Sequence, residues 1–238
     1  MISVFRCHFA IGAGALWACL LFIGLEMGVC METADVRKEI RLPDPHYDSN
    51  TSVEKALLER RSVRHYSDKD VTLGELSQLL WSAQGVTHPR GFRTAPSAGA
   101  LYPLEIVVVA GRISGLGPGI YRYEPGAHEL VKTGDQDRRG ALWRAGLTQG
   151  AIRHAPLVLV YCAVYERTTR KYGERGIRYV HIEVGHAAQN VCLQAISLGL
   201  GTVVIGAFDD KAVKKILELK ADEYPLIIMP VGSPSMEE

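Results

Sequence analysis

Residues 179–198 decide the fold, and their sequence is Tyr-Val-His-Ile-Glu-Val-Gly-His-Ala-Ala-Gln-Asn-Val-Cys-Leu-Gln-Ala-Ile-Ser-Leu. Small and apolar residues recur there at helical spacing. One face of the helix would carry Val184, Ala187, Ala188, Val191, Ala195 and Leu198. Small side chains let a second helix approach closely, and the opposite face is also fairly apolar. We therefore predict a helix buried on both faces, either central or at a dimer interface; an ordinary core helix is the alternative.

The segments on either side of this helix predict one α+β domain. Capping-box patterns begin helices at Thr51 and Thr72, and Asp209 caps another that would end at Leu219. Continuous or alternating apolar runs predict strands, with a hairpin turn between the second and the third. The expected strands are 105–110, 120–123, 129–131, 157–165, 202–207 and 225–229. The domain is expected to span residues 51–234.

The first fifty residues differ from the rest of the chain. Residues 9–25 carry no charge, Arg6 precedes them and Glu26 follows them. This length is at the lower limit for crossing a bilayer and slightly above a usual signal-peptide core. We predict a signal peptide or membrane anchor at 1–30 and a linker or arm at 31–50. The protein would then be exported or membrane-attached, or cytoplasmic if these residues reflect a misassigned start codon.

Charge, cysteine and histidine usage narrow the classes of partner. Lys and Arg number 27 and Asp and Glu number 26, so the formal net charge is +1. A nucleic-acid-binding protein needs a basic excess on one face, so no nucleic acid is expected. Beyond residue 30 only Cys162 and Cys192 remain, too few for a disulfide framework. His181 and His186 are five residues apart, whereas a zinc helix places its histidines four apart, so no metal site is expected.

The segment Arg60-Arg-Ser-Val-Arg64 is the most concentrated group of hydrogen-bond donors. Guanidinium groups offer forked donors that match the oxygens of a phosphate. Three arginines and a serine at the end of a predicted helix therefore indicate a phosphate site. A solvated basic helix end is the alternative interpretation.

Two other segments are rich in small residues. The segment Arg93–Glu105 contains five of them in Ala95-Pro-Ser-Ala-Gly-Ala100, so its backbone could run close to a ligand. The segment Gly199–Asp209 is rich in glycine, but its glycines precede a strand. A dinucleotide-binding loop instead follows a strand and opens a helix, so a Rossmann domain is excluded.

Lys171 and Tyr172 lie within a strongly basic segment, Arg167–Arg178. A lysine among other cations can serve as a general base, with the neighbouring phenol as an acid or an orienting group. A flexible basic loop is the alternative interpretation of the same spacing.

Together these segments resemble the nitroreductase superfamily, and within it the SagB/ThcOx-type dehydrogenases. The resemblance runs from about residue 51 to residue 232, and five motifs carry it in order. They are Arg60-Arg-Ser-Val-Arg-His-Tyr66, Ala95-Pro-Ser-Ala-Gly-Ala-Leu-Tyr-Pro-Leu-Glu105, Lys171-Tyr-Gly-Glu-Arg175, Glu183-Val-Gly-His-Ala-Ala-Gln-Asn190 and Gly201-Thr-Val-Val-Ile-Gly-Ala-Phe208. Each motif alone is weak, whereas the ordered set is specific.

The resemblance implies a mainly antiparallel sheet flanked by helices, and a homodimer that binds FMN at its subunit interface. The residues that would hold the FMN phosphate and ribityl chain are Arg60, Arg61, Ser62 and Arg64. Those that would lie along the flavin, from the partner subunit, are Pro96, Ser97, Ala98 and Gly99. Those whose backbone would face its redox edge are Gly206 and Ala207. Lys171 and Tyr172 match the Lys-Tyr pair that, in azoline dehydrogenases of this branch, helps remove a proton while hydride passes to FMN.

We therefore expect an FMN-dependent oxidoreductase that transfers hydride between a small or peptide-borne substrate and FMN. An NAD(P)H-dependent reductase of nitro compounds or quinones is a second hypothesis. A flavin-binding module without turnover is a third. Lys171 separates the first two, because a dehydrogenase needs a group that takes the substrate proton.

Overall fold

The computed structural model describes residues 39–235. The predicted signal peptide or anchor at 1–30, with its apolar residues 9–25, lies outside the described residues and stays a prediction. Within residues 39–235, no helix is both long enough and apolar enough to cross a membrane.

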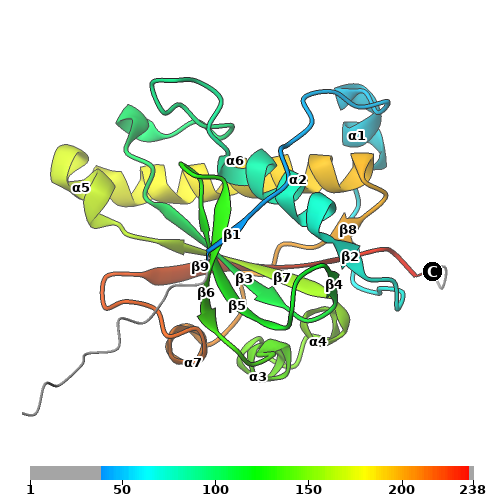
Figure 1. The fold of residues 1–238 in the computed structure, drawn as a ribbon. Coiled ribbons are helices and arrows are strands. Elements are labelled where there is room, and N and C mark those ends of the chain that lie inside the picture. The colour runs from blue at the N-terminus through cyan, green and yellow to red at the C-terminus, as the bar shows by residue number, and fades with distance from the viewer. Residues whose placement is uncertain (1–38, 236–238) are drawn as a thin grey trace, which may run out of the picture. The chain divides into compact units, whose positions relative to one another are not determined.

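Seven strands form one antiparallel sheet in the spatial order β1-β6-β5-β3-β7-β9-β8 (Figure 1). Their bounds are β1 Glu39–Arg41, β3 Leu104–Ala110, β5 Gly119–Glu124, β6 Glu129–Gly134, β7 Leu157–Ala163, β8 Gly201–Thr202 and β9 Tyr224–Gly232. Two short strands, β2 (Val71–Thr72) and β4 (Ile113–Ser114), pair separately in parallel. Part of the segment predicted as a linker or arm thus adds an edge strand, because β1 pairs with β6.

Helices cover both faces of the sheet (Figure 1). One layer consists of α1 (Val53–Glu59), α2 (Leu73–Gln84), α5 (Glu166–Tyr172) and α6 (Arg175–Ser197). The other layer consists of α3 (Arg139–Ala145), α4 (Gly150–His154) and α7 (Asp210–Ile216). The structure therefore confirms the predicted α+β class, in which a mainly antiparallel sheet lies between helices.

Strand β7 at the centre of the sheet divides the hydrophobic core into two. All seven of its residues are buried, and neighbouring side chains point to opposite faces of the sheet. Leu159 and Tyr161 pack towards α2 and α6, whereas Val160 and the free thiol of Cys162 pack towards α3, α4 and α7. A strand with helices on both sides must be apolar throughout, which explains its uninterrupted hydrophobic sequence.

Helix α6 lies across one face of the sheet, packed against α2 (Figure 1). Its buried side chains recur every three or four residues, as the sequence predicted: Val180, Val184, Ala187, Ala188, Val191, Cys192 and Ala195. The opposite face is exposed in the single chain, where Ile177 is 45% and Ile182 is 48% exposed. The prediction of burial on both faces therefore fails within one chain.

Two sequence-based boundaries were wrong. Helix α1 is capped by Ser52 rather than Thr51, since the Ser52 side chain accepts the Lys55 N–H at 3.1 Å. The strand predicted at 202–207 stops at Thr202 and returns as an isolated bridge between Ile205 and Ile228. The ladder breaks where residue 203 should pair with Pro230, because proline has no N–H to donate.

The basic segment 167–178 is helical rather than a flexible loop. It contains the end of α5 and the start of α6, and Gly173 lies between them with a φ of 58°. A positive φ is readily adopted by glycine, so the chain can turn sharply from one helix into the next.

Candidate functional site

The arginine segment runs from the end of α1 beside strand β8. Arg60 ends the helix, Ser62 bridges Thr202 in parallel, and the Val63 N–H donates to the Thr202 carbonyl at 3.0 Å. A Cβ at Gly201 would lie 2.6 Å from the Val63 side chain, so only glycine permits this close approach. The segment is thereby fixed next to residues 203–207.

The three arginines of this segment point to different places. Arg64 lines a pocket and donates only a long hydrogen bond, at 3.4 Å, to the Ser62 carbonyl. Arg61 donates to the carbonyls of Leu58 and Arg60, at 2.9 and 2.8 Å, and so caps the end of α1. Arg60 is half-buried towards α6, where its charge opposes the burial that raises the pKa of the Cys192 thiol.

The pocket beside Arg64, which we call the cationic pocket, has a volume of about 720 Å³. The cationic or titratable bases that line it are Arg64, His65, Arg112, Arg139, Arg153 and His154. Arg112 pairs with Asp70 at 3.5 Å and Arg139 with Asp137 at 2.7 Å, so part of this charge is neutralised. The remaining bases make the pocket suited to an anion.

Residues 203–207 contribute two side chains to the lining of the cationic pocket. Val203 and Ile205 are buried and line it, whereas Val204, Gly206 and Ala207 are exposed. Nothing lies within 4 Å of where a Cβ of Gly206 would be, so the backbone there is open to a ligand. The Gln149 side chain at the start of α4 donates to the Ala207 carbonyl at 3.0 Å and fixes this segment.

A second group of predicted site residues lies in the loop that precedes β3. Gly99, Ala100 and Tyr102 have φ values of 65°, 54° and 45°. A left-handed backbone at a residue other than glycine is uncommon and is retained where the surroundings enforce it. A Cβ at Gly99 would lie 2.8 Å from the Tyr172 hydroxyl and 3.1 Å from Lys171 Nζ. The structure thus brings together two motifs that are seventy residues apart in the sequence.

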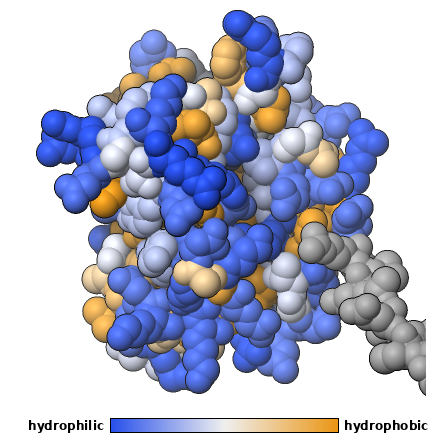
Figure 2. Space-filling view, turned by 90° about the vertical axis from the view of Figure 1, so that its left-hand side faces the viewer, coloured by the Kyte–Doolittle hydropathy of each residue, from blue (hydrophilic) through white to orange (hydrophobic). Residues whose placement is uncertain are grey.

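Lys171 and Tyr172 end helix α5. Lys171 is exposed, with Nζ 5.4 Å from the centre of the Tyr172 ring, and that ring packs edge-on against Tyr179 at 5.1 Å. The molecular face at the α5 end is largely hydrophilic with small apolar spots (Figure 2). The Lys171–Tyr172 pair is therefore accessible to a substrate, and α6 supports it through the contact between Tyr172 and Tyr179.

A buried carboxyl lies beneath the same loop. Glu183 of α6 is 1% exposed, and burial raises the pKa of its carboxyl to about 7. A hydrogen bond from Ser97, the charge of Arg93 and the Gln84 amide oppose this shift. Pro96 beside Ser97 is exposed and Ala98 is half-buried.

The two groups of residues lie at opposite ends of α6. Lys171 and Tyr172 directly precede this helix, whereas Gly206 and Ala207 follow its far end (Figure 1). The helix has 23 residues, which corresponds to about 35 Å at a rise of about 1.5 Å per residue. Among residues 39–235, no hydrogen bond or ion pair connects the loop at Gly99 to the cationic pocket.

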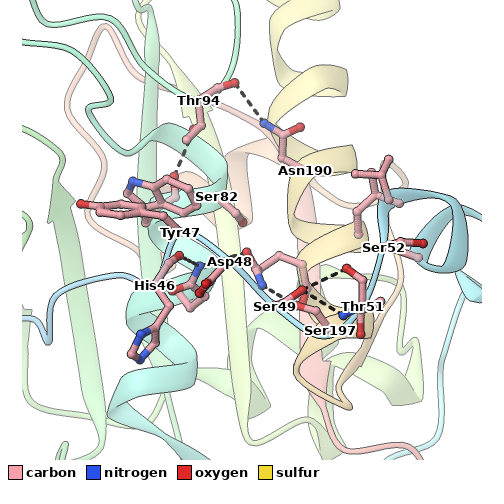
Figure 3. Close-up of a pocket in the computed structure, with 16 residues that line it drawn as sticks. His46, Tyr47, Asp48, Ser49, Thr51, Ser52, Ser82, Thr94, Asn190 and Ser197 are labelled. Atoms are coloured by element: carbon pink, nitrogen blue, oxygen red, sulfur yellow. Dashed lines mark hydrogen bonds between the residues drawn. The ribbon is translucent and has the colours of Figure 1, made fainter.

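Another pocket, of about 510 Å³, lies between residues 46–53 and the helices α2 and α6 (Figure 3). Its polar groups largely bond one another: Gln78 accepts from the His46 N–H at 2.8 Å and donates to the His46 carbonyl at 2.9 Å. Asn190 donates to the Thr94 carbonyl at 3.4 Å. None of the described residues that line it is a lysine or an arginine, so it is poorly suited to a phosphate.

The sequence of most of this domain matches a family model. Residues 57–233 match the model of the Nitroreductase family. The chain belongs to the nitroreductase family. The resemblance stated from the five motifs is thereby confirmed, and the protein is a nitroreductase-family oxidoreductase with that family's fold.

Two relatives show which members of the nitroreductase family this chain is similar to. A candidate nitroreductase of Methanocaldococcus jannaschii is 53% identical over 194 residues, which is 82% of this chain and 96% of the relative. The microcin B17-processing protein McbC of Escherichia coli is 29% identical over 179 residues, or 71% of this chain and 65% of McbC. The chain thus spans somewhat less than two thirds of McbC.

Solved structures agree with this assignment. A candidate nitroreductase from Anabaena variabilis superposes with a TM-score of 0.74 at 30% identity, covering 84% of this chain and 42% of that one. A chain of the E. coli microcin synthetase McbBCD complex, with truncated pro-MccB17 bound, superposes with a TM-score of 0.65 at 28% identity. That match covers 74% of this chain and 70% of the other.

Sequence reasoning missed three members of the site in this nitroreductase-family chain. Gln149 directly precedes and Arg153 lies in a short helix, α4, which the sequence pattern did not reveal. Glu183 was quoted within a motif but given no role. A signal for it did exist, because a glutamate among Val180, Val184 and Ala187 interrupts a buried helix face.

Proposed function

We propose that the protein is an FMN-dependent oxidoreductase and that its cationic pocket holds the flavin phosphate and adjacent groups. FMN carries a phosphate dianion, a hydroxylated chain and a flat aromatic ring. The pocket supplies arginines including Arg64, and Ser62 and the exposed residues Gly206 and Ala207 are close to its lining in the sequence. Its volume lies in the range usual for cofactor sites. Of the three arginines that the resemblance assigns to the phosphate, Arg64 is the best placed, whereas Arg60 is half-buried towards α6 and Arg61 caps α1.

The separation along α6 supports a homodimer in which each site takes residues from both chains. In one chain, Lys171 and the cationic pocket lie towards opposite ends of α6, a helix about 35 Å long, so one FMN would not reach both. A two-fold pairing along the exposed face of α6 brings the first end of one helix next to the second end of the other. That face is apolar at Ile177 and Ile182, and α1 adds exposed Leu57 and Leu58.

The closeness of Gly99 to Lys171 and Tyr172 is the observation that supports a dehydrogenase over the other activities. When bound, FMN would supply hydride transfer. A substrate carbon that loses a hydride loses a proton from a neighbouring atom, and Lys171 Nζ would take that proton. The Tyr172 hydroxyl would orient the substrate or the amine, and Gly99 would hold both side chains towards the flavin. The likeness to McbC supports a substrate carried on a peptide, such as a thiazoline or oxazoline.

The deciding experiment compares Lys171→Ala with the matched variant Arg170→Ala, which removes a neighbouring exposed cation on the same helix. With a thiazoline-containing peptide as the probe, Lys171→Ala should lose dehydrogenation by about a hundredfold or more. Arg170→Ala should retain the activity. An unchanged rate for Lys171→Ala, in protein that retains FMN, contradicts the dehydrogenase.

The 53% identity to a candidate nitroreductase favours a second function, NAD(P)H-dependent reduction of nitro compounds or quinones. This reaction delivers hydride to the substrate and needs no base at Lys171. Lys171→Ala should then leave NADH consumption with a quinone acceptor unchanged. A variant that loses dehydrogenation but keeps quinone reduction shows that only dehydrogenation needs Lys171.

A further inference from the structure

One face of helix α5 is turned towards the loop of residues 97–102. Arg167 and Lys171 are four residues apart in this helix, so their side chains project from the same face. Along the loop, Gly99 lies next to Lys171, and Tyr102 lies next to Arg167. A bond made by Arg167 therefore joins helix and loop one helical turn from the proposed catalytic pair.

The guanidinium of Arg167 has two acceptors on the other side of this contact. Its Nη1 donates to the Tyr102 carbonyl at 3.1 Å, and its Nη2 donates to the Glu105 carboxylate. A guanidinium is a rigid fork of donors, whereas a lysine ammonium is a single point of charge. Tyr102 belongs to the loop and Glu105 to β3, so one side chain fastens α5 to both.

A second arginine anchors Glu105 in the sheet. Arg122 Nη2 lies 3.7 Å from Glu105 Oε2, and the same guanidinium pairs with Glu223. The exposed fractions of the four side chains fall from 42% at Arg167 through 17% at Glu105 and 14% at Arg122 to 1% at Glu223. Solvent screens partly buried ion pairs only weakly. Arg167 therefore holds a carboxylate that is itself fixed.

The backbone that Arg167 holds is strained. Tyr102 has a φ of 45°, and left-handed backbone at a bulky residue persists only where its surroundings enforce it. The Tyr102 N–H donates to Ser97 Oγ at 2.9 Å, and its hydroxyl accepts the Arg93 N–H at 3.2 Å. Of these two bonds and the bond from Arg167, only the last comes from α5. Its loss would let the loop relax away from the helix.

We propose that Arg167 is a positioning residue, which fastens α5 to the loop of residues 97–102 and so keeps Lys171 and Tyr172 next to Gly99. In this role Arg167 acts through the placement of the pair and needs no contact with the substrate. The inference rests on the proposed function, in which that pair handles the substrate proton.

Hydrogen–deuterium exchange of the full chain, followed by mass spectrometry, tests the fastening without substrate. The amides of Ala100 and Tyr102 report on the loop, because they donate to the Ser97 carbonyl and to Ser97 Oγ. In Arg167→Ala these amides should exchange at least about tenfold faster than in the wild type, since charge-assisted bonds are lost.

The matched control is Arg170→Ala, which removes an exposed cation of the same helix that bonds Glu166 at 3.0 Å. Its loop should exchange at the wild-type rate. Equal exchange in Arg167→Ala and Arg170→Ala overturns the proposal.

A kinetic readout separates positioning from substrate binding. With a thiazoline-containing peptide, Arg167→Ala should lower kcat about tenfold to a hundredfold and leave KM unchanged, because displaced groups slow the proton step without removing a substrate contact. A raised KM at the wild-type kcat overturns the proposal, since Arg167 would then bind substrate.

Arg167→Lys keeps the test decisive if Arg167→Ala does not fold. It retains the charge beside Glu105 but cannot bond both acceptors as a fork, so its loop should still exchange faster than that of the wild type. Wild-type exchange and wild-type kcat in this variant overturn the proposal. The exchange measurement needs neither substrate nor FMN, so a failure of the Lys171 experiment would contradict the proposed function and leave the fastening by Arg167 supported.

Discussion

The two ends of α6 carry different kinds of chemistry. At the first end, Lys171 and Tyr172 lie beside a strained loop, and the Glu183 carboxyl is buried nearby. At the second end, Arg64 lines the cationic pocket and the backbone at Gly206 is open. Under the proposed function, the redox site needs both ends, and the difference between them is what a pair of chains would combine.

The largest expected effect comes from mixing two inactive variants. Lys171→Ala inactivates the first end and Arg64→Ala weakens the second, so each homodimer should be inactive at low FMN concentration. Random pairing of refolded or co-expressed chains gives heterodimers with one intact site, and about a quarter of wild-type dehydrogenation should return. Activity with a thiazoline peptide measures this recovery.

The matched control mixes Lys171→Ala with Tyr172→Phe. Both changes lie at the first end, so every heterodimer site contains one of them and no activity should return. Recovery in this control, or none in the first mixture, would show that the two ends of α6 do not meet across chains.

A smaller effect is expected when the first end is distorted. In Gly99→Ala, the new Cβ would lie 2.8 Å from the Tyr172 hydroxyl at a backbone φ of 65°. Displacement of the pair by about 1 Å should lower dehydrogenation about a hundredfold while FMN stays bound. Gly126→Ala, where the added Cβ meets nothing within 4 Å, should keep full activity. Equal rates of dehydrogenation for Gly99→Ala and Gly126→Ala would show that Gly99 has no role in the site.

A substitution at the second end of α6 should change the affinity for FMN rather than the rate of dehydrogenation. Loss of one charge-assisted hydrogen bond in Arg64→Ala should weaken FMN binding about tenfold to a hundredfold, as measured by fluorescence titration. Arg61→Ala should leave that affinity unchanged, because the Arg61 guanidinium caps α1. A similar loss in Arg61→Ala would instead support the role that the sequence resemblance implies for Arg61.

The smallest effect concerns stability away from both ends. Thr72→Ala removes the capping box at the start of α2, in which Thr72 accepts from Glu75 N–H at 3.2 Å. The free energy of unfolding should fall by about 1 kcal/mol in a urea titration. Thr51→Ala should have almost no effect, because Ser52 caps α1. The opposite order of effects would restore Thr51 as the cap.

The sequence predicted those elements whose periodicity is strong. Strand β7 is covered on both faces and helix α6 is packed along one face over its length, so both have unbroken patterns. Helices α3 and α4 have seven and five residues, too few for a periodic signal to emerge. The strand at 202–207 was predicted too long because the break depends on Pro230, a residue of the neighbouring strand. Sequence patterns contain no information about such a pairing.

The candidate site was predictable in composition but not in arrangement. The motifs could be located in the sequence, whereas the closeness of Gly99 to Lys171 and Tyr172 could not. The roles given to these residues stay predictions. The different directions of Arg61 and Arg64 depend on where α1 ends and how the next residues pair with β8. Those are properties of tertiary structure, and local sequence does not specify them.

The length of α6 sets the distance between the two parts of the proposed site. An α-helix turns by about 100° and advances by about 1.5 Å with each residue. Insertion of one residue after Gly185 would therefore rotate one end of the helix by about 100° relative to the other. The two ends would then no longer face the same side of the helix. An insertion of about seven residues restores the rotation but separates the ends by about 10 Å. Under the proposed pairing of two chains, the count of 23 residues in this helix is therefore tied to the distance between the two ends.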